Sequence, residues 1–247
     1  MMADEEQGEA MALMLSLIML AIQATPITPE GQAAVRSVEE DIAAVRARHA
    51  ALPAPEDDRE RLERLGELDQ AGRRVIVALD FSTVPESDRL AAVQAAGELI
   101  DVADRENQAA LLQLLPAEGW FLSSHYGQKA AAAAFHIVQH SDAELWRRFL
   151  PVFEPLVRDG EIEGQSYAMM FDRLATSEGR PQRYGTQFRC DGGKWRPYPI
   201  EDREQLEARR VMMSFPIPFD EYRAHFEKQP SCPQTLSPPP PGMVIED

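Results

Sequence analysis

The residue best suited to acid–base chemistry lies in the segment AAAAAFHIVQHSD, where polar side chains interrupt a long apolar run. His140 can act as a general base, because imidazole changes its charge near neutral pH and a carboxylate can orient the ring. Asp172 or Asp104 could supply that carboxylate. Arg173 directly follows Asp172, and its guanidinium could hold an anionic group or a developing oxyanion. We therefore take His140, Asp172 and Arg173 as the candidate catalytic residues.

A metal site is the main competing interpretation of this segment. His136 and His140 have the i,i+4 spacing of two ligands on one helix face. Zinc proteases with that spacing also need a glutamate base inside the motif, and the residues between these histidines are Ile, Val and Gln. The sequence has five histidines and no other cluster of His or Cys. We therefore expect no metal and no cofactor.

Polar groups also interrupt the apolar faces of other predicted helices. Asp69 and Arg73 lie four residues apart at the margin of one apolar face, where they can pair. Asp104 and Asn107 stand in the middle of a stripe with the spacing of a buried helix face. Because an unpaired buried polar group is costly, such groups normally find one another. We therefore expect these residues to converge.

The segment PQRYGTQF differs from the helical sequence before it, since it places amides, a tyrosine and a threonine around Gly185. We expect its side chains to meet Gln139, His140, Asp172 and Arg173, so that they form one wall of a polar pocket. The predicted pocket lies between the third, fourth and fifth helices and a hairpin. The candidate binding residues are Asp69, Gln70, Arg73, Asp104, Asn107, Gln139, Gln182, Tyr184, Thr186 and Gln187.

The periodicity of apolar residues predicts a mainly α fold, a multi-helix domain with one small β-hairpin at about residues 182–199. The DGG sequence supplies the positive φ values of a tight hairpin turn. Pro151 and Pro155 are expected to bend or end the fourth helix. The predicted helices are 29–51, 57–79, 86–115, 127–150, 165–177, 202–213 and 219–227.

The two ends of the chain differ in composition from its centre. Residues 1–24 have the apolar run and small-residue ending of a signal peptide, although the residues before the run are acidic, so translation could start at Met11. The alternative is a buried or amphipathic N-terminal helix. We divide the rest into a helix and linker (25–56), one helical domain (57–228) and a Pro-rich tail (229–247). The leader predicts an extracytoplasmic protein, periplasmic or secreted; without it the protein would be cytoplasmic.

Charge and cysteine content limit the partners. The formal net charge of −16, with no run of Lys or Arg, argues against nucleic acid and anionic membranes. No segment is long enough for a stable membrane span, because the apolar run of the leader is too short. The partner we expect is a small molecule or a peptide. Cys190 and Cys232 could form a disulfide if the chain is exported.

The combined motifs resemble an uncharacterised bacterial family of unknown function, whose hallmark is Q-x-Y-G-T-Q. The resemblance covers about residues 65–226 and implies that the polar residues above are the functional set, without implying an activity. His136 is outside the family pattern. The matching segments are LDQAGRR, DRENQAALL, Gly119-Trp120, Gln139-His140-Ser141-Asp142, Asp172-Arg173, Gln182-x-Tyr184-Gly185-Thr186-Gln187, and Pro199-Ile200-Glu201-Asp202 leading to Arg209-Arg210.

Three functions remain open on the sequence. The first is an enzyme, a hydrolase or transferase, that uses His140 with a carboxylate and an arginine. The second is a ligand- or peptide-binding module with the same pocket and no turnover. The third is a structural domain whose polar groups only fix the packing of the helices.

Overall fold

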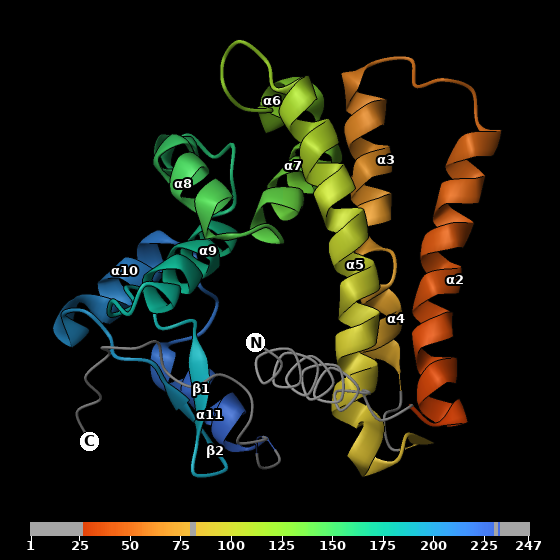
Figure 1. Ribbon diagram of the computed structural model, residues 1–247. Coiled ribbons are helices and arrows are strands. Elements are labelled where there is room, and N and C mark those ends of the chain that lie inside the picture. The colour runs from red at the N-terminus through yellow and green to blue at the C-terminus, as the bar shows by residue number, and fades with distance from the viewer. Residues whose placement is uncertain (1–26, 80–82, 230–231, 233–247) are drawn as a thin grey trace, which may run out of the picture.

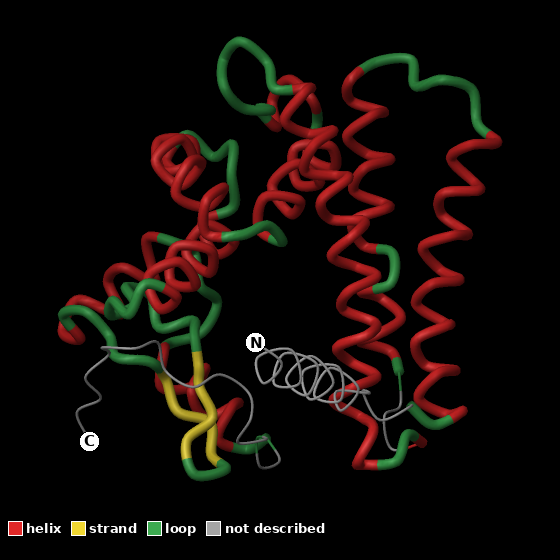
Figure 2. The backbone as a smooth tube through the Cα atoms, viewed as in Figure 1, coloured by secondary structure: helices red, strands yellow, loops and turns green. Residues whose placement is uncertain are grey.

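Helices make up most of the chain in the computed structural model, which describes residues 27–79, 83–229 and 232 (Figures 1 and 2). The fold is mainly α with one two-stranded hairpin among the described residues, so the predicted fold class is confirmed. The elements are α2 (Pro29–Ala51), α3 (Asp58–Gln70), α4 (Arg73–Ala78), α5 (Glu86–Leu114), α6 (Ser123–Tyr126), α7 (Gln128–Gln139), α8 (Ala143–Arg158), α9 (Gly164–Ser177), β1 (Phe188–Asp191), β2 (Lys194–Pro197), the 3-10 turn η2 (Arg203–Gln205), α10 (Leu206–Met212) and α11 (Phe219–Glu227).

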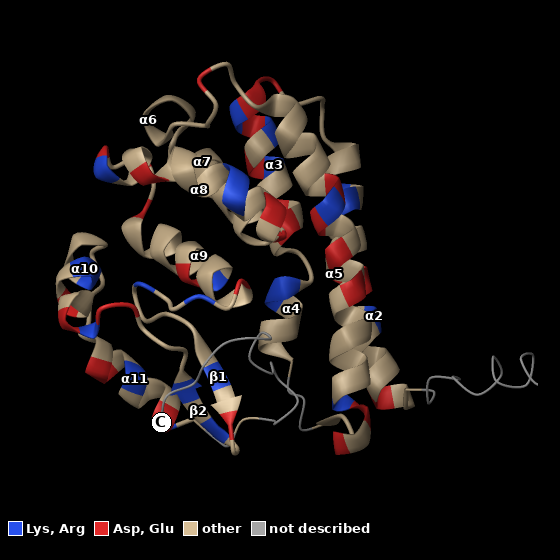
Figure 3. Cartoon of the chain, turned by 60° about the vertical axis from the view of Figure 1, so that its left-hand side comes forward, with Lys and Arg blue, Asp and Glu red and all other residues tan. Residues whose placement is uncertain are grey.

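Helices α2, α3 and α5 run side by side, with the short α4 continuing the line of α3 (Figure 1). Figure 3 shows acidic and basic residues interspersed along α3 and α5, as expected for helices with a solvated surface. The prediction of one helix over 57–79 was wrong, because the chain breaks at Gly72. Gly72 has φ +71°, and a Cβ there would lie 3.0 Å from Val38 and 3.1 Å from Ile100. The break allows the backbone to approach α2 and α5 closely.

Helix α7 is the centre of the main hydrophobic core. It packs on α3 and α5, with Ala133 against Gly66 of α3, while Phe135 contacts the Phe153 ring of α8 with centroids 5.3 Å apart. The aromatic rings of Trp120, Phe149 and Phe153 fill the space beside it, with the Trp120 and Phe153 centroids 4.4 Å apart. Each such ring contributes roughly 2–3 kcal/mol through removal from water. The position of α7 is thereby fixed from several sides.

The fourth predicted helix, 127–150, was wrong in two respects. The chain breaks after Gln139, and the Asp142 side chain then begins α8 by accepting hydrogen bonds from the N–H groups of Glu144 (2.9 Å) and Leu145 (3.2 Å). Helix α8 also continues through Pro151 and Pro155 to Arg158. Both prolines are exposed, so the carbonyls that lose a helical partner can reach water. The burial of the apolar face of α8 outweighs the two missing hydrogen bonds.

The predicted hairpin is present but shorter than expected. Cys190 pairs with Trp195 in the antiparallel register, and the turn uses Gly192 at φ 56° and Gly193 at φ 76°. Residues 182–187 were predicted to belong to the hairpin, but they form a loop before β1. Cys190 forms a disulfide with Cys232.

The predicted leader and most of the predicted Pro-rich tail lie outside the described residues. Within the described ranges, no helix combines the length and the apolar character needed to cross a bilayer.

Candidate functional site

A histidine–carboxylate pair lies where α3 and α7 end. His140 Nδ1 is 3.0 Å from each carboxylate oxygen of Asp69. The Asp69 side chain is 1% exposed, whereas the His140 side chain is 23% exposed. The sequence analysis expected Asp172 or Asp104 to orient this histidine, and that pairing was wrong. Because α7 packs along α3, the end of α7 carries His140 to Asp69, which is 71 residues away in sequence.

The helix ends fix the ring of His140. His140 is the C-cap residue of α7, with φ −89° and ψ 6°, and its backbone N–H donates to the carbonyl of His136. Asp69 is buried in the last turn of α3. With Nδ1 on Asp69, Nε2 is the ring nitrogen left for another partner, and among the described residues no hydrogen bond to it is formed.

Arg73 joins this pair to a second carboxylate. At the start of α4, Arg73 Nη1 donates to Asp104 Oδ1 at 2.8 Å, and Nη2 donates to Asp104 Oδ2. Arg73 Nη1 also donates to the backbone carbonyl of Asp69 and lies 3.6 Å from Asp69 Oδ1. The guanidinium is therefore held by a bidentate pair. Its side chain remains 21% exposed, so Arg73 and His140 form the accessible part of the cluster.

The two amides predicted for this region, Gln70 and Asn107, contact α3. Gln70 Nε2 donates to Asp69 Oδ2 at 2.8 Å, and Asn107 Nδ2 donates to the carbonyl of Leu65 at 3.3 Å. Asn107 is buried, and its Oδ1 has no partner among the described residues. Hydrogen bonds therefore connect His140 with four of the predicted site residues, Asp69, Gln70, Arg73 and Asp104. Asn107, one turn after Asp104 on α5, is counted with them. We call this group the His140 cluster.

A separate polar cluster surrounds Asp172 on α9. Asp172 Oδ1 accepts from the N–H of Arg183 (2.7 Å) and of Tyr184 (3.0 Å). Its Oδ2 accepts from the N–H and the hydroxyl of Thr186, both at 3.0 Å. Burial raises the pKa of Asp172, and the N–H donors of Thr186, Arg183 and Tyr184 oppose that rise. Residues 183–186 thus form a loop instead of a strand, because their N–H groups are used by this carboxylate. We call this group the Asp172 cluster.

The two glutamines of the hallmark segment close the same loop internally. Gln182 is fully buried and bridges the two ends of the loop. Gln182 Oε1 accepts from the Gln187 N–H at 2.8 Å, and Gln182 Nε2 donates to the carbonyls of Gln187 and Tyr198. Gln187 Nε2 donates to Thr186 Oγ1 at 3.0 Å. These contacts hold the loop against the hairpin, and among the described residues no hydrogen bond joins a side chain of residues 182–187 to His140.

Two arginines of α10 donate hydrogen bonds to the backbone of the Asp172 cluster. Both were named from the sequence only as part of the family motif. Arg209 Nε donates to the carbonyl of Arg183 at 2.9 Å, and Arg210 Nη1 donates to the carbonyl of Tyr184 at 2.9 Å. Arg210 is buried, and its guanidinium lies 4.1 Å from the centre of the Phe215 ring. An Arg-Arg pair on a short helix resembles an ordinary solvated face, so the sequence carries no signal for this burial.

Arg173 lies between the two clusters. Its Nη1 donates to the carbonyl of Gln139, the residue before His140, at 3.3 Å, and its guanidinium lies 5.7 Å from the Trp146 ring centre. Burial lowers the pKa of Arg173. Arg173 thus contacts the backbone carbonyl of Gln139, which was not predicted from the sequence. The catalytic roles assigned to His140, Asp172 and Arg173 stay predictions.

His136 is a further residue of the region that was considered only as a metal ligand. Its ring stacks on His140, with centroids 6.2 Å apart and planes at 23°. Burial lowers the pKa of His136, and the neighbouring His140 lowers it further, while Asp69 and Glu163 act in the opposite direction. Among the described residues, no three His, Cys, Asp or Glu side chains are placed to hold a metal ion.

This shift predicts how acid affects stability. A histidine whose pKa is lower in the folded state than in the unfolded state favours unfolding as the pH falls, because the unfolded chain binds the proton first. The melting temperature should therefore fall less between pH 7.5 and 5.5 in His136→Gln than in the wild type. Each pKa unit of difference corresponds to about 1.4 kcal/mol. His225→Gln, an exposed histidine on α11, is the control, and an identical loss in all three proteins would contradict the prediction.

Together these features define a class: a mainly helical domain with a histidine–aspartate pair at one helix end and a loop built around a buried aspartate. The chain belongs to the family of unknown function DUF6624, whose model matches residues 55–230. The resemblance inferred from the motifs is thus confirmed at the level of such a family. Searches among curated proteins and among solved structures found no match.

Proposed function

We propose that the His140 cluster is the active site of a hydrolase in which His140 is the general base. The observation that carries this proposal is the contact of His140 Nδ1 with the buried carboxylate of Asp69, at 3.0 Å, beside a partly exposed imidazole. An orienting carboxylate fixes the tautomer and the ring direction and stabilises the imidazolium that forms when the base takes a proton.

In the proposed reaction, Nε2 of His140 takes a proton from water while the water oxygen attacks an electrophilic centre. The imidazolium then returns this proton to the leaving group as the bond between that group and the centre breaks. Arg73 stabilises the negative charge that develops on that centre. Its guanidinium has five N–H donors, and the bonds to Asp104 and to the Asp69 carbonyl use those on Nη1 and one on Nη2. Among the described residues, no group accepts from the N–H of Nε or from the second N–H of Nη2, and we assign both to a substrate oxygen.

The competing function is a structural polar network without turnover. The paired Arg73 and Asp104 favour it, since such buried pairs often fix helix packing. A ligand- or peptide-binding role for the same surface is the third candidate. The three differ in whether His140 is needed for stability, for binding or for a chemical step.

The test is a panel of chromogenic ester, phosphate, glycoside and peptide substrates, applied to the wild type, His140→Ala and Asp69→Asn. We expect one substrate class to be hydrolysed, with kcat about 10²- to 10⁴-fold lower in His140→Ala. Circular dichroism and the melting temperature establish that each variant is folded. His225→Ala, which changes an exposed histidine, should keep full activity.

A panel without any turnover, or turnover that survives His140→Ala, would reject the hydrolase. A large fall in the melting temperature of His140→Ala would then favour the structural network.

The disulfide supports an extracytoplasmic location, which we include in the proposal. Cys190 and Cys232 are bonded in the structure, and structural disulfides are typical of the periplasm and of secreted proteins. Fractionation of cells that produce the full chain, with detection by an antibody to the folded domain, tests this location.

A further inference from the structure

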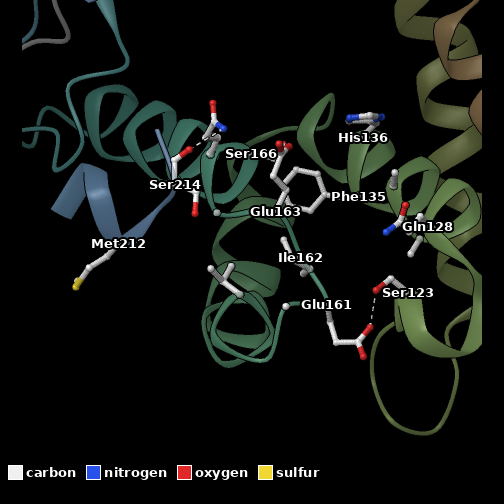
Figure 4. A pocket seen from close by; sticks show the side chains of 16 residues that line it. Ser123, Gln128, Phe135, His136, Glu161, Ile162, Glu163, Ser166, Met212 and Ser214 are labelled. Carbon is white, nitrogen blue, oxygen red and sulfur yellow. Dashed lines mark hydrogen bonds between the residues drawn. The ribbon is translucent and has the colours of Figure 1, made fainter. Parts of the chain in front are cut away.

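A pocket of about 600 Å³ lies between one face of α7, the loop before α9 and the residues that follow α10. Figure 4 shows His136 and Gln128 on the α7 wall, with Ser166 and Ser214 on the opposite side. None of the residues of the His140–Asp69 pair lines it. Its volume is within the range of roughly 300–1,000 Å³ that small-molecule sites occupy.

Part of the inner surface of the pocket is apolar. Phe135 and Ile162 line it and are buried. Ala131 and Ala132, on the same stretch of α7, leave space that larger side chains would fill. A hydrocarbon or aromatic body can therefore be removed from water here, which stabilises binding by about 25 cal/mol per Å² of apolar surface.

The charged groups of the lining are acidic. Glu161 and Glu163 line the pocket, and its described lining contains no Lys or Arg. Glu161 Oε2 already accepts from Ser123 Oγ (2.8 Å) and the Ser124 N–H (2.9 Å). Hydrogen bonding from the side chain and the backbone of Ser124, and then from Ser123, lowers the pKa of Glu161 to about 2. It therefore stays ionised at every physiological pH.

Glu163 has a carboxylate oxygen that can accept a hydrogen bond from a ligand. Its Oε2 accepts from Ser166 Oγ at 2.6 Å, and Oε1 has no partner among the described residues. The N-terminus of α9 adds a positive partial charge of about half a unit, which two carboxylates exceed. His136 adds no positive charge at neutral pH, since burial and His140 lower its pKa. The lining therefore favours a cation and disfavours an anion.

We propose that this pocket binds a small organic amine, with its ammonium group on Glu163 and its hydrocarbon body against Phe135 and Ile162. The inference goes beyond the proposed hydrolysis, because neither His140 nor Asp69 takes part in binding. The link to the His140 cluster is His136, which lines the pocket and stacks on His140 with centroids 6.2 Å apart. An amine bound in the pocket would thus lie on the far side of His136 from His140.

Three probes share a 2-phenylethyl group and differ in the charge of the polar group that it carries: 2-phenylethylamine, 2-phenylethanol and 3-phenylpropanoate. Comparing them distinguishes the effect of charge from the effect of shape. Each is titrated into the full chain and followed by isothermal calorimetry and by amide shifts in nuclear magnetic resonance spectra. We expect saturable binding of the amine with a Kd of about 1 mM or below. The alcohol should bind about tenfold more weakly, since it lacks the charge-assisted hydrogen bond, and the carboxylate should not bind.

Two matched pairs of variants locate the site. Glu163→Gln should weaken amine binding about tenfold by removing the charge, whereas Glu98→Gln, an exposed glutamate on α5, should not. Ala132→Leu should abolish binding by filling the pocket, and Ala109→Leu, on an exposed face of α5, should leave it intact. Amide shifts should centre on residues 128–136 and 160–166.

Equal or tighter binding of 3-phenylpropanoate would overturn the proposal, and so would an unchanged amine affinity in Glu163→Gln. Absence of saturable binding by all three probes would overturn it as well. His140→Ala should bind the amine normally, so a failure of the proposed hydrolysis leaves this result unaffected.

Discussion

Asp172→Asn should lower the stability of the domain more than any other single isosteric change at a predicted site residue. The carboxylate accepts hydrogen bonds from four donors in residues 183–186, three N–H groups and one hydroxyl. An asparagine would turn an NH2 group toward some of these donors and leave them unpaired inside the protein. The relief of charge burial offsets only part of that cost. We expect a loss of about 3–5 kcal/mol.

The measurement is the melting temperature, which should fall by roughly 10 °C, since a chain of this size shifts about 2–4 °C per kcal/mol. Asp101→Asn, an exposed aspartate on α5, is the control and should shift the melting temperature by less than about 2 °C. An unchanged melting temperature in Asp172→Asn, together with lost activity, would instead support the catalytic role predicted from the sequence.

Gly185→Ala should also be strongly destabilising, for a steric reason. Gly185 has φ +72°, and a Cβ at this position would lie 2.6 Å from two carbon atoms of the Phe219 ring. The left-handed backbone costs about 1–2 kcal/mol for a residue with a Cβ, and the overlap with a buried ring adds about 1–3 kcal/mol. We therefore expect a loss of about 2–5 kcal/mol in the free energy of unfolding.

The matched control is Gly97→Ala in α5, where a Cβ would meet nothing within 4 Å. This change should stabilise the protein by about 0.5–1 kcal/mol, because alanine is the better helix former. Urea denaturation of both variants measures the two effects. Equal effects of the two substitutions would mean that the loop does not need a glycine at position 185.

The sequence predicted helix ends well where the signal was local. Helix α2 was predicted at 29–51 and lies at Pro29–Ala51, because the proline occupies its first turn and Thr28 caps it. The break at Gly72 was missed, since its cause is contact with α2 and α5, which are remote in sequence. The continuation of α8 through Pro151 was missed for the same kind of reason: tertiary packing overrides a local signal.

In the candidate site too, local patterns were predicted and contacts remote in sequence were missed. The residue types were found from polar groups on apolar faces, and Asp69, Arg73, Asp104 and His140 do form one cluster. The partner of His140 was missed: Asp172 or Asp104 was predicted, and Asp69 reaches His140 only because α7 packs along α3, a contact remote in sequence. The role of residues 182–187 was also hidden, because the hydrogen bonds to Asp172 come from backbone N–H groups, which every sequence carries.

Helix α7 takes part in three features: the contact with Arg173, the His140–Asp69 pair and the acidic pocket. Its last carbonyl receives Arg173, its end residue holds His140 on Asp69, and one turn earlier His136 faces the acidic pocket. A helix of this length moves as a rigid rod, so these groups cannot shift independently. The wall of the pocket and the imidazole are therefore parts of one helix, so the position of α7 sets the place of both.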